Sequence, residues 1–301
     1  MKNEELKNYI EAGKIAKEVM EFCKGFVKPG LKLIDIALAV DDKIKELGGD
    51  FAFPVNLSLD EIAAHFTPEA GDETIAEGIL KVDFGVCVNG FIADCAFSVD
   101  LTEDKKFEEM IELNKKILAK VKEKIRYGME VREVGDAVFN VLEEHNRKNK
   151  KSFTVIRSLS GHELGENKIH AGLTISNYRN DNTTDLDEKA FAIEPFVTTG
   201  VGDVYEGKGG GIYVLQSDGN VREKDSREIL KYIKENYKTR PFCLRWLERA
   251  GFKKIKFSIG NLVKQGILYQ YPLLIEKSKV PVSQFEHTFI LHDGKVFCTT
   301  D

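Results

Sequence analysis

Long hydrophobic runs and paired cysteines are both missing from this sequence of 301 residues. No apolar stretch approaches the roughly 18 residues that a membrane-spanning helix needs, and the start, Met1-Lys-Asn-Glu-Glu5, has no apolar signal region. The five cysteines are odd in number and scattered, without a CxxC pair, so neither a disulfide framework nor a zinc knuckle is indicated. We therefore expect a cytoplasmic protein without membrane contact, in which cysteine serves packing.

Composition and charge narrow the class further. With 42% hydrophobic and 31% charged residues, the chain can bury a full core, which excludes disordered and fibrous classes. The net charge is −5, yet thirteen Lys/Arg stand against five Asp/Glu between Arg222 and Lys264, a local excess of eight. Such an excess of positive charge most often indicates a helical face exposed to solvent. The functional alternative is weak docking on ribosomal RNA, where attraction depends on salt.

Two aspartates eleven residues apart, Asp83 and Asp94, stand in a run that alternates apolar and other residues with period two. Asn89-Gly90 in its middle is the strongest short signal for a two-residue hairpin turn. Such a turn places Asp94 opposite Gly85, with Asp83 as its diagonal neighbour at roughly 7–8 Å. The residues alone leave open two interpretations, exposed polar positions on an edge hairpin or half of a metal site.

Three later segments carry an acid or an imidazole in an apolar context, at His162, Glu194 and Glu286. A glutamate in a strand-like run with aromatic neighbours is unusual, because buried carboxylates are costly unless they are paired or neutralised. Four carboxylates and one histidine fit two divalent cations. A ligand set rich in oxygen and free of cysteine favours manganese, cobalt or iron over structural zinc.

The chain contains an internal repeat. Helical patterns at 2–27 and 34–47 are separated by Lys28-Pro29-Gly30, and matching periodicity follows Gly128 about 98 residues later. In each half, a strand-like segment with an acid follows the helix pair. A duplicated unit related by a pseudo-twofold axis would bring both acidic strands into one cleft.

The stretch 204–271 interrupts the second half with helical patterns at 225–237, 241–250 and 256–265. It opens with the glycine cluster 207–211, which lacks the Lys-Ser/Thr of a phosphate-binding loop and is more typical of a flexible connector. We therefore expect an α+β catalytic domain spanning 1–301, with an inserted, helical, winged-helix-like subdomain at 205–272.

Several motifs resemble those of methionine aminopeptidases with the pita-bread fold, specifically the type 2 class in its short archaeal form. The resemblance covers nearly the whole chain, and the inserted lobe separates type 2 from type 1. The motifs are Phe53-Pro54, Ala63-Ala-His65-Phe-Thr-Pro68, the Asp83/Asp94 hairpin, Gly161-His162, His170-Ala-Gly172, Phe191-Ala-Ile-Glu194, Phe242-Cys-Leu-Arg-Trp246-Leu247 and Gln284-Phe-Glu286-His-Thr288.

The resemblance implies roles for ten residues. It implies two divalent metal ions, Co, Mn, Fe or Zn, bound by Asp83, Asp94, His162, Glu194 and Glu286, with Glu194 as general base. His65 and His170 would contact the substrate and donate to the developing oxyanion. Phe53, Ile169 and Tyr271 would line the methionine pocket or its mouth.

By the same resemblance the protein is a hydrolase, a monomer that removes the initiator methionine from nascent polypeptide N-termini and prefers small second residues. One competing interpretation is an Xaa-Pro dipeptidase, whose members usually carry a large N-terminal domain and an extra histidine motif. Another is a binding module that has lost its metals. All five predicted metal ligands are present here, which argues against the binding module.

Six further positions qualify this interpretation. His145 and His292 are interpreted as structural histidines. His287 is also interpreted as structural, because it follows a ligand on a strand and should point to the opposite face. Three departures concern Asp60, where many relatives have asparagine, Cys87, where many have histidine, and Ile212, a frequent histidine in eukaryotic members. None of these three is expected to be a ligand, but Ile212 changes the polarity expected of the pocket.

Overall fold

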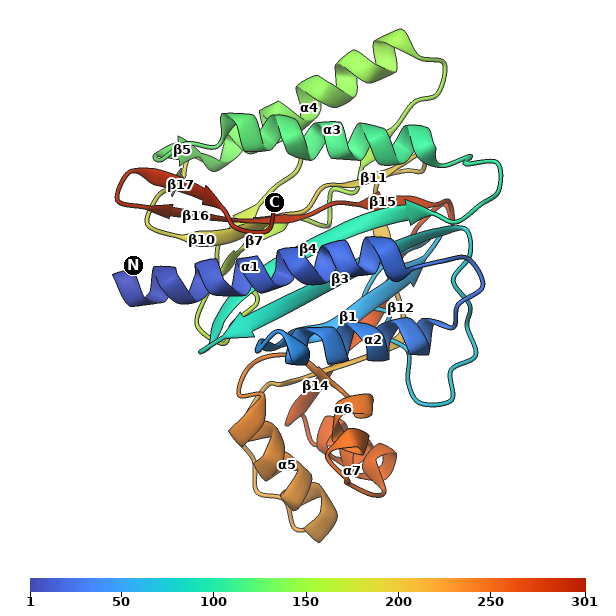
Figure 1. Ribbon diagram of the computed structural model, residues 1–301, viewed down its shortest axis with the longest axis vertical. Coiled ribbons are helices and arrows are strands. Elements are labelled where there is room, and N and C mark those ends of the chain that lie inside the picture. Colours follow the sequence, from blue (N-terminus) through green and yellow to red (C-terminus); the bar gives the residue numbers. More distant parts are fainter.

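Two helix pairs, each lying on β-strands, organise the structure, a computed structural model of residues 1–301 (Figure 1). In the first half, α1 packs on β3 and β4, and α2 packs on β1. This sheet has the order β1-β3-β4. The elements are α1 (Asn3–Phe26), α2 (Leu33–Glu46), β1 (Asp50–Leu59), β2 (Ile62–Ala64), β3 (Ile79–Val88) and β4 (Phe91–Asp100).

The second half repeats this plan with shorter strands. Its sheets have the orders β17-β16-β10-β7-β8, β15-β11-β6 and β5-β9. The helices are α3 (Glu108–Lys124) and α4 (Val131–Lys148). The strands are β5 (Met129–Glu130), β6 (Thr154–Val155), β7 (Gly161–Leu164), β8 (Thr174–Ile175), β9 (Asp185–Leu186), β10 (Ala190–Ile193), β11 (Phe196–Thr198), β15 (Val282–Gln284), β16 (His287–His292) and β17 (Lys295–Cys298).

The predicted repeat is confirmed by the two helix breaks. Gly30 and Gly128 have φ angles of +83° and +70°, and nothing within 4 Å would meet a Cβ at either position. Glycine is therefore favoured at both breaks by backbone conformation and not by space. The helices predicted at 2–27 and 34–47 differ from α1 and α2 by one residue at each boundary. None of the helices is long and apolar enough to cross a membrane.

Residues of the inserted lobe continue from a β-ribbon of the main body, at the bottom of Figure 1. Its sheet has the order β13-β12-β14-β2, so the lobe is joined to β2 of the first half. The elements are β12 (Val204–Leu215), α5 (Lys224–Asn236), β13 (Phe242–Cys243), α6 (Leu244–Arg249), α7 (Ile255–Lys264) and β14 (Leu268–Glu276). A separate cluster of sixteen buried hydrophobic residues fills the lobe. Its description as a winged-helix-like subdomain at 205–272 stays a prediction.

The expectation of a flexible glycine connector is wrong. Residues 207–211 lie inside β12. A Cβ at Gly210 would lie 1.7 Å from the backbone oxygen of His65, and one at Gly209 would lie 2.1 Å from the Gln270 amide nitrogen. The missing side chains therefore let β12 approach neighbouring groups closely. Composition suggested mobility, whereas tertiary packing requires the glycines.

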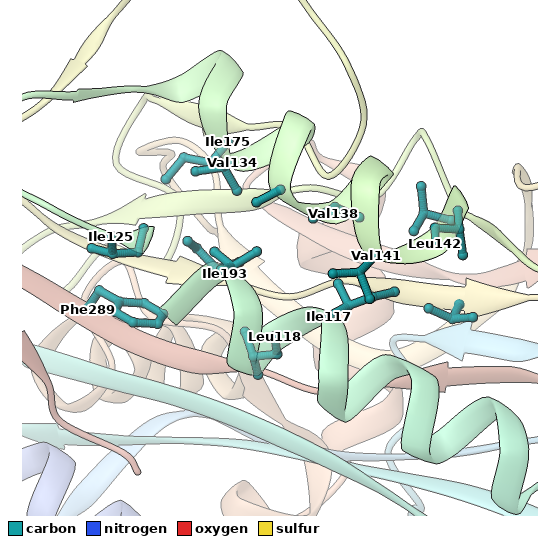
Figure 2. Packing of buried hydrophobic residues seen from close by; sticks show 14 of the residues in the cluster. Ile117, Leu118, Ile125, Val134, Val138, Val141, Leu142, Ile175, Ile193 and Phe289 are labelled. Carbon is teal, nitrogen blue, oxygen red and sulfur yellow. The ribbon is translucent and has the colours of Figure 1, made fainter. Parts of the chain in front are cut away.

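The second-half core lies between α3, α4 and the strands beneath them. Figure 2 shows Ile117 and Leu118 of α3 facing Val138 and Val141 of α4, with Ile193 nearby. These side chains are between 0% and 6% exposed. The cluster fixes the helix pair on the strands that lead to Glu194 and Glu286.

Replacing Ile117 by alanine should therefore lower the free energy of unfolding by about 2–5 kcal/mol, because the substitution leaves a cavity in a packed core. The matched control is Ile10→Ala on α1, where the side chain is 40% exposed. Urea unfolding followed by circular dichroism measures both. Equal losses in the two variants would contradict the assignment of Ile117 to the core.

Candidate metal centre and substrate cleft

Asp83 and Asp94 lie on the β3–β4 hairpin in the predicted register. The turn residues Asn89-Gly90 have φ angles of +52° and +93°, as a two-residue turn with both central residues left-handed requires. Asp94 pairs with Gly85, which confirms the register. Gly85 also shapes the site, because a Cβ there would lie 2.4 Å from the ring of Phe53.

The sequence suggested that Glu194 and Glu286 lie inside strands. In the structure both lie at interruptions between strands. β10 pairs with β16, and β11 pairs with β15. Glu194-Pro195 separates β10 from β11, and Phe285-Glu286 separates β15 from β16. A local break in the hydrogen bonding between paired strands changes the direction of side chains, which then no longer alternate between the two faces of the sheet. The backbone of Glu286 then pairs with Ala96 of β4, next to Asp94.

His162 on β7 completes the cluster. Its Nε2 lies 3.6 Å from Oδ2 of Asp94 and 3.6 Å from Oε1 of Glu194. These distances are too long for hydrogen bonds and suit atoms that share one cation at about 2.0–2.2 Å. One ligand atom each from Asp94, His162 and Glu286 also lies within 4.8 Å of the others.

Burial sets the electrostatics of the cluster. It raises the pKa of Asp83 to about 7. The pKa values of Asp94, Glu194 and Glu286 are raised well above their usual range, first by burial and then by mutual repulsion. Burial lowers the pKa of His162 to about 3, so the imidazole is neutral, as a metal ligand must be.

Several buried atoms of the cluster have no hydrogen-bond partner: Oδ1 of Asp83, Oδ1 of Asp94, Oε1 of Glu286 and Nδ1 of His162. The only ion-pair contacts of the carboxylates are those with His162. Unpaired buried charges are strongly unfavourable. Divalent cations would neutralise the carboxylates and use their free lone pairs, so these residues fit a metal centre.

All ten residues predicted from the sequence line one cavity of about 550 Å³. The structure therefore brings together Phe53, His65, Asp83, Asp94, His162, Ile169, His170, Glu194, Tyr271 and Glu286. The lining combines the four carboxylates with apolar side chains such as Phe53, Ile169 and Ile212. A polar reacting end and an apolar pocket are typical of a small-molecule or peptide-terminus site.

His65 is held in an unusual conformation and a defined tautomer. Its φ angle is +71°, and its ring contacts Tyr271 edge-on at 5.2 Å between centroids. Nδ1 lies 3.1 Å from the carbonyl oxygen of Pro272. Because a carbonyl only accepts, Nδ1 must carry the hydrogen and Nε2 must be the free acceptor. Burial lowers the pKa of His65 to about 4, so the ring stays neutral at neutral pH.

This geometry corrects one expectation from the sequence. A neutral His65 that donates through Nδ1 has no hydrogen left on Nε2, so it cannot donate to an oxyanion. Nε2 can instead accept a hydrogen bond from a substrate N–H. His170 is exposed to the cleft and lies edge-on to His162, with 4.4 Å between ring centroids.

The apolar wall of the cleft combines distant segments. Phe53 and Ile169 are both 8% exposed and belong to one hydrophobic cluster. Ile212 also lines the cleft at 3% exposed, so it adds an apolar side chain to the pocket, as the sequence led us to expect. Asp60 and Cys87 do not line it.

Two functional residues were missed from the sequence. The Gln284 amide donates to Oδ2 of Asp83 at 3.2 Å and to Oε2 of Glu194 at 3.4 Å. The Asn56 side chain accepts from the backbone N–H of His65 at 2.8 Å. Gln284 stood inside a recognised motif, two residues before Glu286, and could have been found. Asn56 carried no comparable signal.

The remaining histidines lie outside the cleft, in agreement with their interpretation as structural. Nδ1 of His287 lies 3.0 Å from Oγ1 of Thr300. His145 contacts Glu109 at 3.2 Å, and His292 contacts Glu188 at 2.9 Å.

Comparison with known proteins identifies the family. Residues 7–229 match the model of metallopeptidase family M24. The chain is 43% identical to the methionine aminopeptidase of Pyrococcus horikoshii, with 97% of this chain and 98% of the relative covered. It is 40% identical to that of Archaeoglobus fulgidus, with both chains fully covered. Methionine aminopeptidase 2 of Candida albicans is 33% identical over 97% of this chain and 69% of its own length.

Solved structures agree on the fold. Methionine aminopeptidase of Thermotoga maritima superposes with a TM-score of 0.70 at 20% identity, covering 100% of this chain and 98% of its own. A thermophilic Arx1 gives 0.78 at 16% identity, over 99% and 91%. Prolidase of Pyrococcus furiosus gives 0.61 at 15% identity, over 100% and 64%. The chain has the pita-bread fold and belongs to metallopeptidase family M24, among the methionine aminopeptidases of type 2.

Proposed function

We propose that this protein removes the N-terminal methionine from polypeptides whose second residue is small, by attack of activated water on the first peptide bond. The observation that carries the proposal is the buried group of four carboxylates and His162, with unpartnered oxygens, beside an apolar pocket. The methionine aminopeptidases among its relatives support the reaction.

The cofactors of this proposal are two divalent ions, chosen from manganese, cobalt, iron and zinc. Asp83, Asp94, Glu194 and Glu286 supply four negative charges against the four positive charges of two such ions. Carboxylates can bridge two cations, and a neutral His162 adds a nitrogen ligand to one of them. Bound divalent ions activate water and polarise the scissile carbonyl.

Glu194 is the residue we propose as general base. Its side chain is 15% exposed and faces the cleft, whereas Glu286 is 1% exposed. The Gln284 amide holds one oxygen of Glu194, which fixes the direction of the other. Glu194 can thus take a proton from water and hand it to the leaving amine, a role that requires access to both.

His65 and His170 are proposed to hold the substrate from two sides. Nε2 of His65 accepts from the N–H of the scissile amide, and His170 donates to its carbonyl oxygen. Phe53, Ile169 and Tyr271 would surround the methionine side chain, with Ile212 extending the apolar wall. The narrow space between the metal ligands and His65 would then exclude large second residues.

Peptides that differ only in the second residue test this specificity. We expect kcat/KM for a Met-Gly start to exceed that for a Met-Leu start by about 10-fold or more, because a bulky side chain has to displace packed groups. Release of free methionine measures it. Peptides that begin with leucine are the control for the first position, and equal values for Met-Gly and Met-Leu would contradict the proposed cleft.

Glu194→Gln and Glu286→Gln separate the base from a ligand. Glutamine keeps the size and one oxygen donor but removes basicity, so Glu194→Gln should lower kcat by about 10²–10⁴. Glu286→Gln should lose activity mainly through metal loss and recover part of it in excess manganese. Metal titration of both variants measures the difference. Recovery of Glu194→Gln to near wild-type kcat would leave Glu194 as a ligand only.

The proposed partners are nascent polypeptide N-termini. A second proposed contact is weak binding of the basic inserted lobe to ribosomal RNA. The excess of eight positive charges is smaller on the surface, because Arg240 and Arg245 are only 4% and 3% exposed. These two pair with Asp50 and Asp41 outside the lobe. The monomeric state stays a prediction.

Charge reversal tests the ribosome contact. Changing Lys253, Lys254 and Lys256 to glutamate should reduce co-sedimentation with ribosomes at low salt, since the attraction is electrostatic. Reversal of Lys148, Lys150 and Lys151, at the far end of α4, makes the same charge change outside the lobe. Co-sedimentation that is unchanged, or is reduced equally by both sets, would remove the lobe from the contact.

A further inference from the structure

A buried arginine of the inserted lobe reaches the segment that follows His65. Arg245 on α6 is 3% exposed. One of its terminal nitrogens donates to Oγ1 of Thr67 at 3.2 Å and to the carbonyl oxygen of Pro68 at 2.7 Å. Thr67 is only two residues after His65, so the position of Arg245 bears directly on the backbone that carries the imidazole.

Arg245 is itself fixed by the first half of the chain. Its Nε donates to Oδ2 of Asp41 on α2 at 3.0 Å, and Asp41 is 1% exposed. The indole N–H of Trp246 donates to the same oxygen at 2.9 Å, and its ring stacks on Phe51 of β1 at 4.2 Å. A buried ion pair is tolerated only with good geometry and further hydrogen bonds. This arrangement therefore has little freedom.

The His65 segment needs such support because its conformation is unfavourable. A left-handed backbone costs about 1–3 kcal/mol for a residue other than glycine and persists only when its surroundings determine it. Asn56 holds the His65 N–H. On the other side, the Thr67 N–H donates to the Gly210 carbonyl at 3.0 Å. Arg245 adds two bonds just beyond, from a helix anchored on α2.

We infer that Arg245 is a positioning residue for His65, so that a buried residue of the inserted lobe acts on the active site in addition to the lining residues Ile212 and Tyr271. Asp41 orients the guanidinium, the guanidinium holds Thr67 and Pro68, and these hold the His65 backbone so that Nδ1 meets Pro272 and Nε2 faces the cleft. The inference rests on the proposed role of His65 in substrate binding and adds a lobe residue to it.

Arg245→Lys tests the inference against a matched control on the same helix. Lysine keeps the positive charge near Asp41 but lacks the fork that reaches Asp41, Thr67 and Pro68 together. The control is Arg249→Lys, since Arg249 also lies on α6 and pairs with an α2 aspartate, Asp42, at 2.5 Å. That pair is exposed, at 47% and 63%.

We expect kcat/KM for a Met-Gly peptide to fall about 10-fold to 100-fold in Arg245→Lys, because a displacement near 1 Å can cost that much. Arg249→Lys should change it less than about 2-fold, as exposed ion pairs contribute little. Manganese affinity should stay unchanged in both variants, since neither arginine touches a metal ligand. Loss of metal affinity together with activity would overturn the positioning role.

Nitrogen-15 NMR of the imidazoles gives a readout that does not depend on turnover. The wild type should show the Nδ1–H tautomer for His65, identified as the signal lost in His65→Gln. Arg245→Lys should shift this signal toward the Nε2–H form, because the bond to Pro272 is loosened. Arg249→Lys should leave it unchanged.

Thr67→Val provides a second variant that leaves the Asp41–Arg245 pair intact and keeps the test valid if Arg245→Lys does not fold. It should produce a smaller change of the same kind in the His65 signal. The inference is overturned if Arg245→Lys shows the wild-type His65 signal, or if both arginine variants have equal effects. If Arg245→Lys does not fold, a wild-type His65 signal in Thr67→Val overturns it instead. A wild type that releases no methionine defeats the proposed function, and the NMR comparison still decides the positioning of His65.

Discussion

Mutual repulsion among four buried carboxylates is the constraint on which the rest of this structure depends. Asp83, Asp94, Glu194 and Glu286 lie in one cavity with no lysine or arginine paired to them. Left to itself, such a group would keep protons or spread apart. The fold must therefore hold the four side chains close against their repulsion in a geometry that cations can neutralise, which calls for backbone that is fixed by strand pairing in or beside each carboxylate.

The duplicated architecture supplies that rigidity by bonding the two halves together beside the ligands. Thr288 of β16 accepts the Asp94 N–H at 2.7 Å and donates to the Asp94 carbonyl at 2.8 Å. Ser98 of β4 exchanges hydrogen bonds with the backbone of Gln284 at 2.8 and 2.9 Å. Each pair includes or lies close in sequence to Asp94 or Glu286. Neither half could place all four carboxylates alone, so the carboxylate cluster is a property of the interface between the repeats.

The sequence could predict the features that depend on interactions between residues close together along the chain. The Asp83/Asp94 register rests on a local turn and the helix breaks rest on backbone preferences of glycine, so both were readable. The strand interruptions at Glu194 and Glu286 were not, because they depend on which strands pair across the two halves. The glycine-rich run 207–211 was wrongly predicted to be a flexible connector for the same reason. The close approach of β12 to the His65 carbonyl at Gly210 and to the Gln270 amide at Gly209 explains why these two positions lack side chains.

The same burial acts in opposite directions on the acids and the imidazoles of the cleft. It favours the neutral form of each, which raises the pKa of the carboxylates and lowers that of His65 and His162. The raised pKa values favour protonated carboxylates in the absence of cations, so binding of metal would be accompanied by release of protons. The histidines are already neutral at that point. In the proposed function, His162 is then available as a metal ligand and His65 presents a lone pair to the substrate. Burial thus prepares the histidines in advance and leaves the charge state of the carboxylates to be set by the metal.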